Sequence, residues 1–262
     1  MTPEEPPVNL APVSGPPEPP PAPEPAAPPL PERDPFWGYS DLLWFAGMAI
    51  GAMLVGWAVG GLTLALFKLK VASLAAEMIV LYAVLFGSLQ VMFRVRYDRP
   101  FWRSLGWKPI RLPVMMVMLS GMITAVLVAM ASTLIRTPTG ENPMTQLLET
   151  RADVLVMGTL GITLAPICEE LAFRGFLQPL LVRSLGAVPG IALAAVAFGL
   201  LHFQEYGNSW RHALIIALAG AAFGCMRHAT GSTKAAAIMH AAYNLLFFIA
   251  LMTEKRILPQ IW

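Results

Sequence analysis

The sequence predicts an all-α, polytopic membrane helical bundle with about seven transmembrane helices and a disordered, proline-rich N-terminal tail. Three observations lead to this fold class. The 262 residues are 56% hydrophobic and only 13% charged, whereas about 25% of a soluble domain is charged. Apolar runs of about 20 residues recur, and that length spans a bilayer. Most Lys and Arg residues fall in the short segments between those runs.

Seven apolar runs are expected to form the helices. They are Asp41–Phe67, Ala72–Phe93, Val114–Ile135, Val154–Leu181, Val188–Phe203, Ala213–Met226 and Lys234–Met252. The fifth and sixth runs are short and rich in Gly and Ala. Because small residues let helices pack closely, we expect these two helices to lie inside the bundle, away from lipid.

The chain is expected to divide into three regions. Residues 1–36 hold 15 of the 24 prolines, and such a segment buries too little apolar surface to offset the entropy of ordering. We predict a disordered tail whose partner the sequence does not identify. Residues 37–135 would form the N-terminal transmembrane helices and a basic loop, and residues 136–262 a C-terminal core that carries the chemistry.

The distribution of basic residues predicts the orientation in the membrane. Residues 94–113 carry six Lys and Arg against one Asp, and loops of this kind face the cytoplasm. Two spans earlier, the proline-rich tail would lie on the same side. The expected location is therefore a cell membrane, with a cytoplasmic N-terminus. The net charge of +2 and the absence of a long basic run give no indication of a nucleic-acid partner.

The fourth run contains ionisable residues, which are costly at membrane depth and usually functional. Glu170 and Arg174 are four residues apart, so they share a helix face and are expected to pair. Glu169 points about 100° away, without a local cation. It is expected to face a cavity and to act as a general base and then a general acid. The alternative is that all three residues form one packing network.

Two later runs add polar side chains. The fifth run ends at His202, four residues after Phe198, and the seventh carries His240 and Asn244, again four residues apart. Each has a structural explanation: an interfacial histidine for His202, and a hydrogen bond between helices for Asn244. Taken together, however, carboxylate, imidazole and amide groups on successive runs suggest a hydrolytic site.

These three motifs resemble the CAAX protease and bacteriocin-processing (CPBP) family of intramembrane proteases, which includes prenyl-protein endopeptidases. The motifs are EExxxR at Glu169–Arg174, FxxxH at Phe198–His202 and HxxxN at His240–Asn244. The resemblance covers residues from about 154 to 251. It implies that Glu169 and His202 activate a water, that His240 and Asn244 stabilise the oxyanion, and that Glu170 and Arg174 support Glu169.

The resemblance leaves the metal question open, because the family is also described as metalloproteases. Glu169, His202 and His240 would make a plausible zinc set with one open position. Activation of water by Glu and His without a metal fits the same residues, so no cofactor is certain and Zn is one alternative.

The function predicted from the sequence is therefore that of a membrane-embedded endopeptidase. Its substrate would be a membrane-associated peptide or protein, with lipidated and CAAX-like sequences among the candidates, and the compact chain resembles prokaryotic members. A non-catalytic immunity or scaffold protein of the same family is the alternative. A proton-coupled carrier is a third hypothesis. Many carriers are built from two repeated halves, and this sequence shows no such repeat.

Overall fold

A computed structural model describes residues 34–138, 140, 143, 146, 148 and 150–253. The predicted disordered tail lies outside the described residues. The described residues belong to one compact unit.

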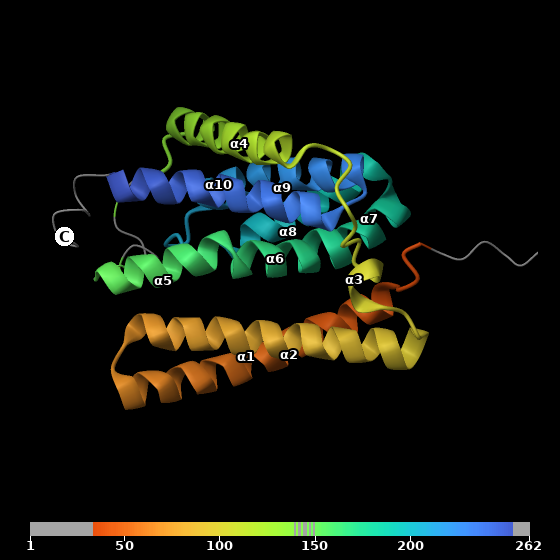
Figure 1. Cartoon of the computed structure of the whole chain (residues 1–262), viewed down its shortest axis with the longest axis horizontal. Coiled ribbons are helices and arrows are strands. Elements are labelled where there is room, and N and C mark those ends of the chain that lie inside the picture. Colours follow the sequence, from red (N-terminus) through yellow and green to blue (C-terminus); the bar gives the residue numbers. More distant parts are fainter. Residues whose placement is uncertain are drawn as a thin grey trace, which may run out of the picture. The chain divides into compact units, whose positions relative to one another are not determined.

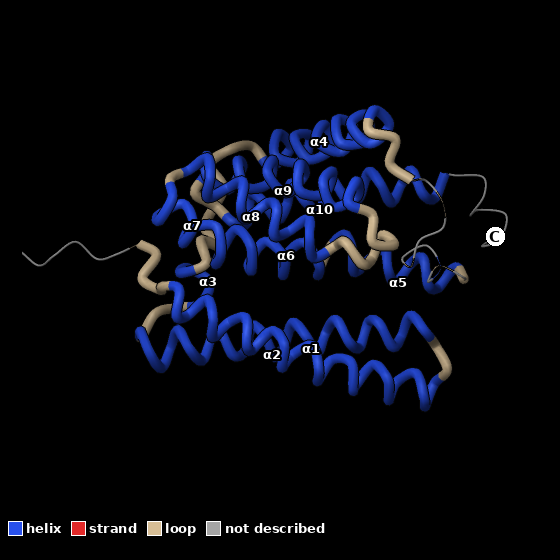
Figure 2. The backbone as a smooth tube through the Cα atoms, turned by 180° about the vertical axis from the view of Figure 1, so that it is seen from behind, coloured by secondary structure: helices blue, strands red, loops and turns tan. Residues whose placement is uncertain are grey.

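The regular structure in the described residues is entirely helical, and no strand is drawn in Figure 2. The helices in chain order are α1 (Tyr39–Phe67), α2 (Lys70–Tyr97), α3 (Phe101–Ser104), α4 (Val114–Leu134), α5 (Arg151–Ile162), α6 (Leu164–Glu170), the π-helix η2 (Leu171–Leu177), α7 (Gln178–Leu185), α8 (Ala187–Leu201), α9 (Trp210–Thr230) and α10 (Thr233–Thr253). The predicted all-α class is confirmed.

Six helical runs are long and apolar enough to cross a membrane, so the chain is a multi-pass membrane protein. One of these runs, Ala152–Leu185, joins α5, α6, η2 and α7 into a single span. Each of the seven predicted runs coincides with a helix. The fifth, α8, has only 15 residues, which explains why six rather than seven helices meet the length of a full span.

The helices are arranged in layers (Figure 1). The α1–α2 hairpin forms one layer, the run from α5 to α7 lies next to it, and α8, α9, α10 and α4 lie beyond. Aromatic residues join the hairpin to η2 near one end. Trp37 stacks on Phe93 and on Phe176, and its indole N–H donates to the Phe176 carbonyl at 3.1 Å. The segment that leads into α1 is thereby fixed to the fourth span.

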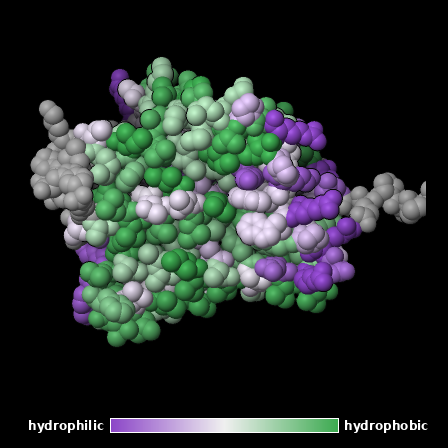
Figure 3. All heavy atoms as spheres, viewed as in Figure 1, coloured by the Kyte–Doolittle hydropathy of each residue, from purple (hydrophilic) through white to green (hydrophobic). Residues whose placement is uncertain are grey.

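The basic loop that follows α2 packs against the turn between α9 and α10. The Thr233 amide donates to the Gly106 carbonyl at 2.9 Å, and the Ser232 hydroxyl donates to the Lys108 carbonyl at 2.8 Å. Hydrophilic residues gather at this end of the bundle, whereas hydrophobic residues cover most of the face in Figure 3. The tail junction, the basic loop and the α9–α10 turn therefore share one end.

The expectation that the short helices avoid lipid is wrong for one face of each. On α8, small residues and Phe198 are buried against neighbouring helices. Its opposite face exposes Val188, Leu193, Val196, Leu200 and Leu201, and α9 exposes Trp210, Leu214 and Leu218. Close packing needs small residues on one face only, so a Gly/Ala-rich composition does not predict burial all round.

Candidate active site

The fourth span changes from α-helix to π-helix directly after the paired glutamates. Residues Leu164–Glu170 are α-helical and Leu171–Leu177 form η2. A π-helical turn inserts extra backbone and redirects the side chains that follow it, and such turns are frequent at functional sites. The sequence predicted a continuous helix here, because no local composition marks the change.

Glu170 is the most buried acid of the site, with no exposed surface. The Arg174 guanidinium donates to its Oε1 at 3.0 Å, so the ion pair predicted from the spacing is present. The same Oε1 lies 2.9 Å from Nδ1 of His240 on α10. One carboxylate therefore holds two basic side chains from different spans.

Arg174 is enclosed by protein, with 1% of its surface exposed. Its second terminal nitrogen donates to the Gly220 carbonyl of α9 at 2.7 Å. Its guanidinium carbon lies 4.4 Å from the ring centre of Phe198 and 5.5 Å from that of Phe223. These cation–π contacts and hydrogen bonds replace the water that a buried guanidinium loses.

His240 lies between the two neighbouring glutamates. Its Nδ1 faces Glu170, and its Nε2 lies 3.9 Å from Oε2 of Glu169. The His240 side chain is 5% exposed, whereas that of Glu169 is 21% exposed. Because Glu170 is committed to Arg174, it is an acceptor for the Nδ1 proton, an assignment that follows from the hydrogen-bond pattern. Nε2 is then the nitrogen available for chemistry.

His202 caps the end of α8 and shares an aromatic neighbour with His240. Its Nδ1 lies 2.9 Å from the Phe198 carbonyl, and a carbonyl can only accept, so Nδ1 carries the proton and Nε2 a lone pair. The ring centre of Phe198 lies 4.7 Å from that of His202 and 5.8 Å from that of His240. Phe198 is therefore in ring contact with both imidazoles.

Asn244 lies one helical turn after His240 but contacts a different neighbour. Its amide nitrogen donates to the Gly161 carbonyl of α5 at 2.7 Å. This is the bond between helices that competes with a catalytic role in the sequence. The side chain is half-buried, and the amide retains a second N–H.

Sequence reasoning did not single out Glu205, which lies in the turn between α8 and α9. This carboxylate interacts electrostatically with His202 and Glu169. Desolvation raises the pKa of Glu205, His202 lowers it and Glu169 adds to the rise. The residue is exposed on the protein surface, so its carboxyl is only partly desolvated. Its position three residues after His202 was the available signal.

Tyr82 of α2 was also missed. It interacts electrostatically with Glu169 and Glu205, although it lies outside the three motifs. It is seven residues before Leu89, which is buried with Leu171 in the cluster between α2 and η2. Residues seven apart share a helix face, so this face of α2 extends to the level of Glu169.

The predicted zinc set does not form a metal site in this arrangement. Across the described ranges, no three or more His, Cys, Asp or Glu side chains are grouped so that they could hold a metal ion. Glu169, His202 and His240 therefore do not fit zinc as they lie.

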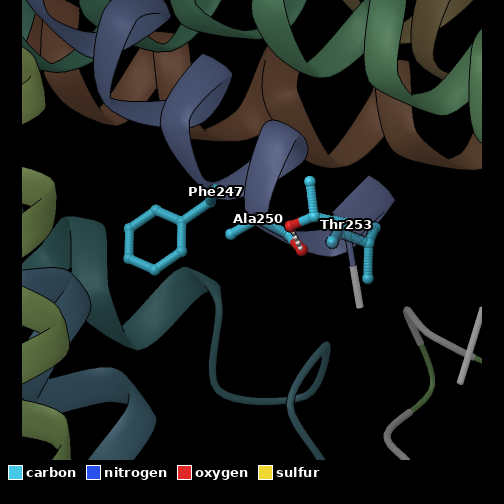
Figure 4. Close-up of a pocket in the computed structure, with 4 residues that line it drawn as sticks. Phe247, Ala250 and Thr253 are labelled. Carbon is cyan, nitrogen blue, oxygen red and sulfur yellow. Dashed lines mark hydrogen bonds between the residues drawn. The ribbon is translucent and has the colours of Figure 1, made fainter. Parts of the chain in front are cut away.

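A hollow of about 460 Å³ lies at the C-terminal end of α10. It is lined by Phe247, Ala250, Leu251 and Thr253, and Figure 4 shows the Thr253 hydroxyl donating to the Ala250 carbonyl within the helix. None of these four described residues carries an acid, a base or a thiol, so they supply no catalytic group.

Comparison with known families adds one finding. Residues 151–246 match the family model described as "Type II CAAX prenyl endopeptidase Rce1-like". The match runs from the start of α5 into α10 and contains all six residues predicted for the site. No curated protein and no solved structure matches the chain.

Proposed function

We propose that this protein, whose residues 151–246 form an Rce1-like domain of the type II CAAX prenyl endopeptidase family, hydrolyses a peptide bond of a membrane-associated substrate. The family implies a peptidase. The observation that carries the mechanism is the placement of His240 between Glu170 and Glu169. It gives one acid a structural task and leaves the other for chemistry.

The attacking nucleophile is a water held by Glu169. A gap of 3.9 Å separates Glu169 Oε2 from His240 Nε2, so a water can lie at hydrogen-bonding distance, about 2.8 Å, from both atoms. Glu169 takes a proton from this water as the oxygen attacks the scissile carbonyl. The His202 Nε2 lone pair accepts the second water proton in a hydrogen bond and orients the attack.

The oxyanion that forms is stabilised by donors from α10. In the reacting state His240 is an imidazolium: its Nδ1–H donates to Glu170, and its Nε2–H donates to the attacking water and then to the oxyanion. The second N–H of Asn244 is the further donor of this set. Glu169 then returns its proton to the leaving amine, which completes general base and general acid catalysis by one group. Low-dielectric surroundings strengthen each of these interactions.

The test is turnover by the full-length protein in liposomes. The probes are a fluorogenic peptide with a farnesylated cysteine three residues from its C-terminus and the same peptide without the lipid. Glu169→Gln should reduce cleavage by at least about 10²-fold, the scale of general acid–base catalysis, and His202→Ala should do the same. Cleavage of the lipidated probe alone would assign the substrate class.

Glu77 supplies the matched control. It is an acid in the first half of α2 that packs against Gly60 of α1, on the side of the hairpin that the mechanism does not use. Glu77→Gln should keep turnover within about twofold of wild type. If Glu169→Gln cleaves as fast as Glu77→Gln, the catalytic assignment of Glu169 is wrong.

A further inference from the structure

A second hollow lies at the end of the bundle that carries the basic loop. Its volume is about 270 Å³. Three basic side chains line it: Arg183 from the last turn of α7, and Arg227 and His228 from the last turn of α9. Asp34, ahead of α1, is the acid among the lining residues. The hollow therefore carries an excess of positive charge that the proposed catalysis does not use.

The two arginines retain donors for a ligand. Arg183 uses Nη1 to bind the Pro35 carbonyl, and Arg227 uses Nε to bind the Thr233 hydroxyl at 3.0 Å. A guanidinium has five N–H groups in a planar fork that suits phosphate oxygens. Among the described residues, each arginine is thus held by one hydrogen bond, Arg227 also interacts electrostatically with Asp34, and each planar fork has further N–H groups.

Helix ends alone do not explain why the three basic side chains meet. Basic residues in the last turns of α7 and α9 interact favourably with the carbonyl ends of their own helices. That interaction needs no shared space, yet Arg183 of α7 and Arg227 and His228 of α9 line the same hollow. Two helices therefore direct cations into one space, with the apolar side chain of Val182 in its wall.

The position of the hollow indicates the source of the anion. Arg183 and Arg227 lie within three residues of the ends of their spans, the depth at which lipid headgroups lie. Leu185 and Val188, which follow Arg183 in the chain, are 48% and 80% exposed and offer an apolar surface for an acyl chain. Basic pockets between transmembrane helices at this depth suit phosphate headgroups.

We propose that this hollow binds the phosphate of an anionic phospholipid headgroup. Arg183 and Arg227 donate to the phosphate oxygens, His228 offers a ring N–H, and the lipid tail follows the exposed side chains beyond α7. The Asp34 carboxylate opposes the anion and limits its affinity.

One residue that lines the hollow lies one helical turn from Arg174. Gln178 lines the hollow, is 3% exposed, and donates to the Gly224 carbonyl at 2.9 Å. Arg174, one turn earlier, donates to the Gly220 carbonyl in the same way. These two bonds attach the η2–α7 run to α9, so a headgroup that bridges α7 and α9 reinforces the attachment that holds Arg174.

The experiment is native mass spectrometry of the full chain in detergent, titrated with dioleoyl phosphatidylglycerol or dioleoyl phosphatidylcholine. Wild type should retain one phosphatidylglycerol in preference to phosphatidylcholine, with a higher melting temperature when it is bound. The double variant Arg183→Gln/His228→Gln changes two exposed side chains and should weaken phosphatidylglycerol binding at least about fivefold, from about 1 kcal/mol for the arginine alone. Asp34→Asn should strengthen it.

The control removes two positive charges from the same end of the bundle but outside the hollow. Arg103→Gln/Arg111→Gln, two exposed residues of the basic loop, should leave binding within about twofold of wild type. Equal losses in both double variants would mean a general charge effect and would overturn the site. Equal retention of the two lipids would do the same. Inorganic phosphate is titrated in the same way. If it binds as tightly as phosphatidylglycerol, the ligand of the hollow is a soluble phosphate compound and the lipid assignment is wrong.

Discussion

Glu169 and Glu170 are adjacent in the chain, but they have different surroundings. Glu170 is fully buried and is held by Arg174 and His240. Glu169 keeps 21% of its side chain exposed, and its nearest basic atom lies at 3.9 Å. A substitution should therefore affect stability at one position and catalysis at the other.

Glu170→Gln is expected to destabilise the fold by about 3–5 kcal/mol, because it leaves the buried Arg174 without its carboxylate. Thermal unfolding of the purified variants in detergent measures this effect. Glu169→Gln is the isosteric control at the adjacent position, and it should unfold within a few degrees of wild type. Equal melting temperatures for the two variants would show that the Glu170–Arg174 pair is solvated.

The raised pKa of Glu205 predicts a dependence of stability on pH. A carboxyl whose pKa is higher in the folded chain than its ordinary value of 4.5 stabilises the fold below that value, and this contribution disappears as the pH rises through the folded pKa. Glu205→Gln should therefore melt increasingly above wild type as the pH is raised from about 4.5 to 8. Parallel melting curves across this range would contradict the assignment.

For individual residues, the sequence predicted contacts within one helix but few contacts between helices. The four-residue spacing was enough to pair Glu170 with Arg174. The bond between Glu170 and His240 joins residues 70 positions apart, and Asn244 bonds to Gly161 across 83 positions. Such contacts depend on how the spans pack, which spacing along one chain does not determine.

Among the elements, α8 and α9 pack closely against each other near the site. Gly199 of α8 lies against the Ala213 carbonyl of α9, so a Cβ at this position would collide with the backbone. His202 is three residues further along the same helix. The glycine therefore sets the distance between α8 and α9 and, through it, the position of one catalytic imidazole.

Gly199→Ala is expected to force α8 away from α9, with a loss of about 1–3 kcal/mol from overpacking and lower turnover because His202 moves. Melting temperature and peptide cleavage should fall together. Gly87→Ala of α2 is the matched control, since a Cβ there meets nothing within 4 Å. Wild-type behaviour of Gly199→Ala would mean that α8 adjusts without moving the site.

Each of the seven apolar runs predicted from hydropathy is helical, because apolar length is a local property of the chain. The π-helix η2 was not predicted, since Leu171–Leu177 has the composition of an ordinary helix. The outward face of α8 was not predicted either, because Gly and Ala content indicates close packing without saying on how many sides.

For the whole molecule, the two ends of the bundle differ in charge. The basic loop, the junction to the tail and the hollow with Arg183 lie at one end. Two turns lie at the opposite end, because each follows a span that starts at the basic end. They are the turn between α1 and α2 and the turn between α8 and α9. The excess of basic residues still predicts a cytoplasmic position for the first end.

Labelling of single cysteines in intact cells would test this orientation. In a Cys225→Ser background, Arg103→Cys in α3 should react with a membrane-impermeant maleimide only after the cells are permeabilised. Leu69→Cys, in the exposed turn between α1 and α2, should react without permeabilisation. The reverse pattern would place the basic end outside and invert the topology.

The 15 residues of α8 extend about 22 Å at 1.5 Å per residue, whereas the hydrocarbon layer is about 30 Å thick. Lipids that contact its outward leucines and valines must therefore shorten or tilt their chains. Such hydrophobic mismatch costs fractions of a kcal/mol per Å and sorts proteins between membranes. The protein should accordingly concentrate in thin membrane regions, and lengthening the lipid acyl chains in a reconstituted bilayer should strain the wall that carries His202.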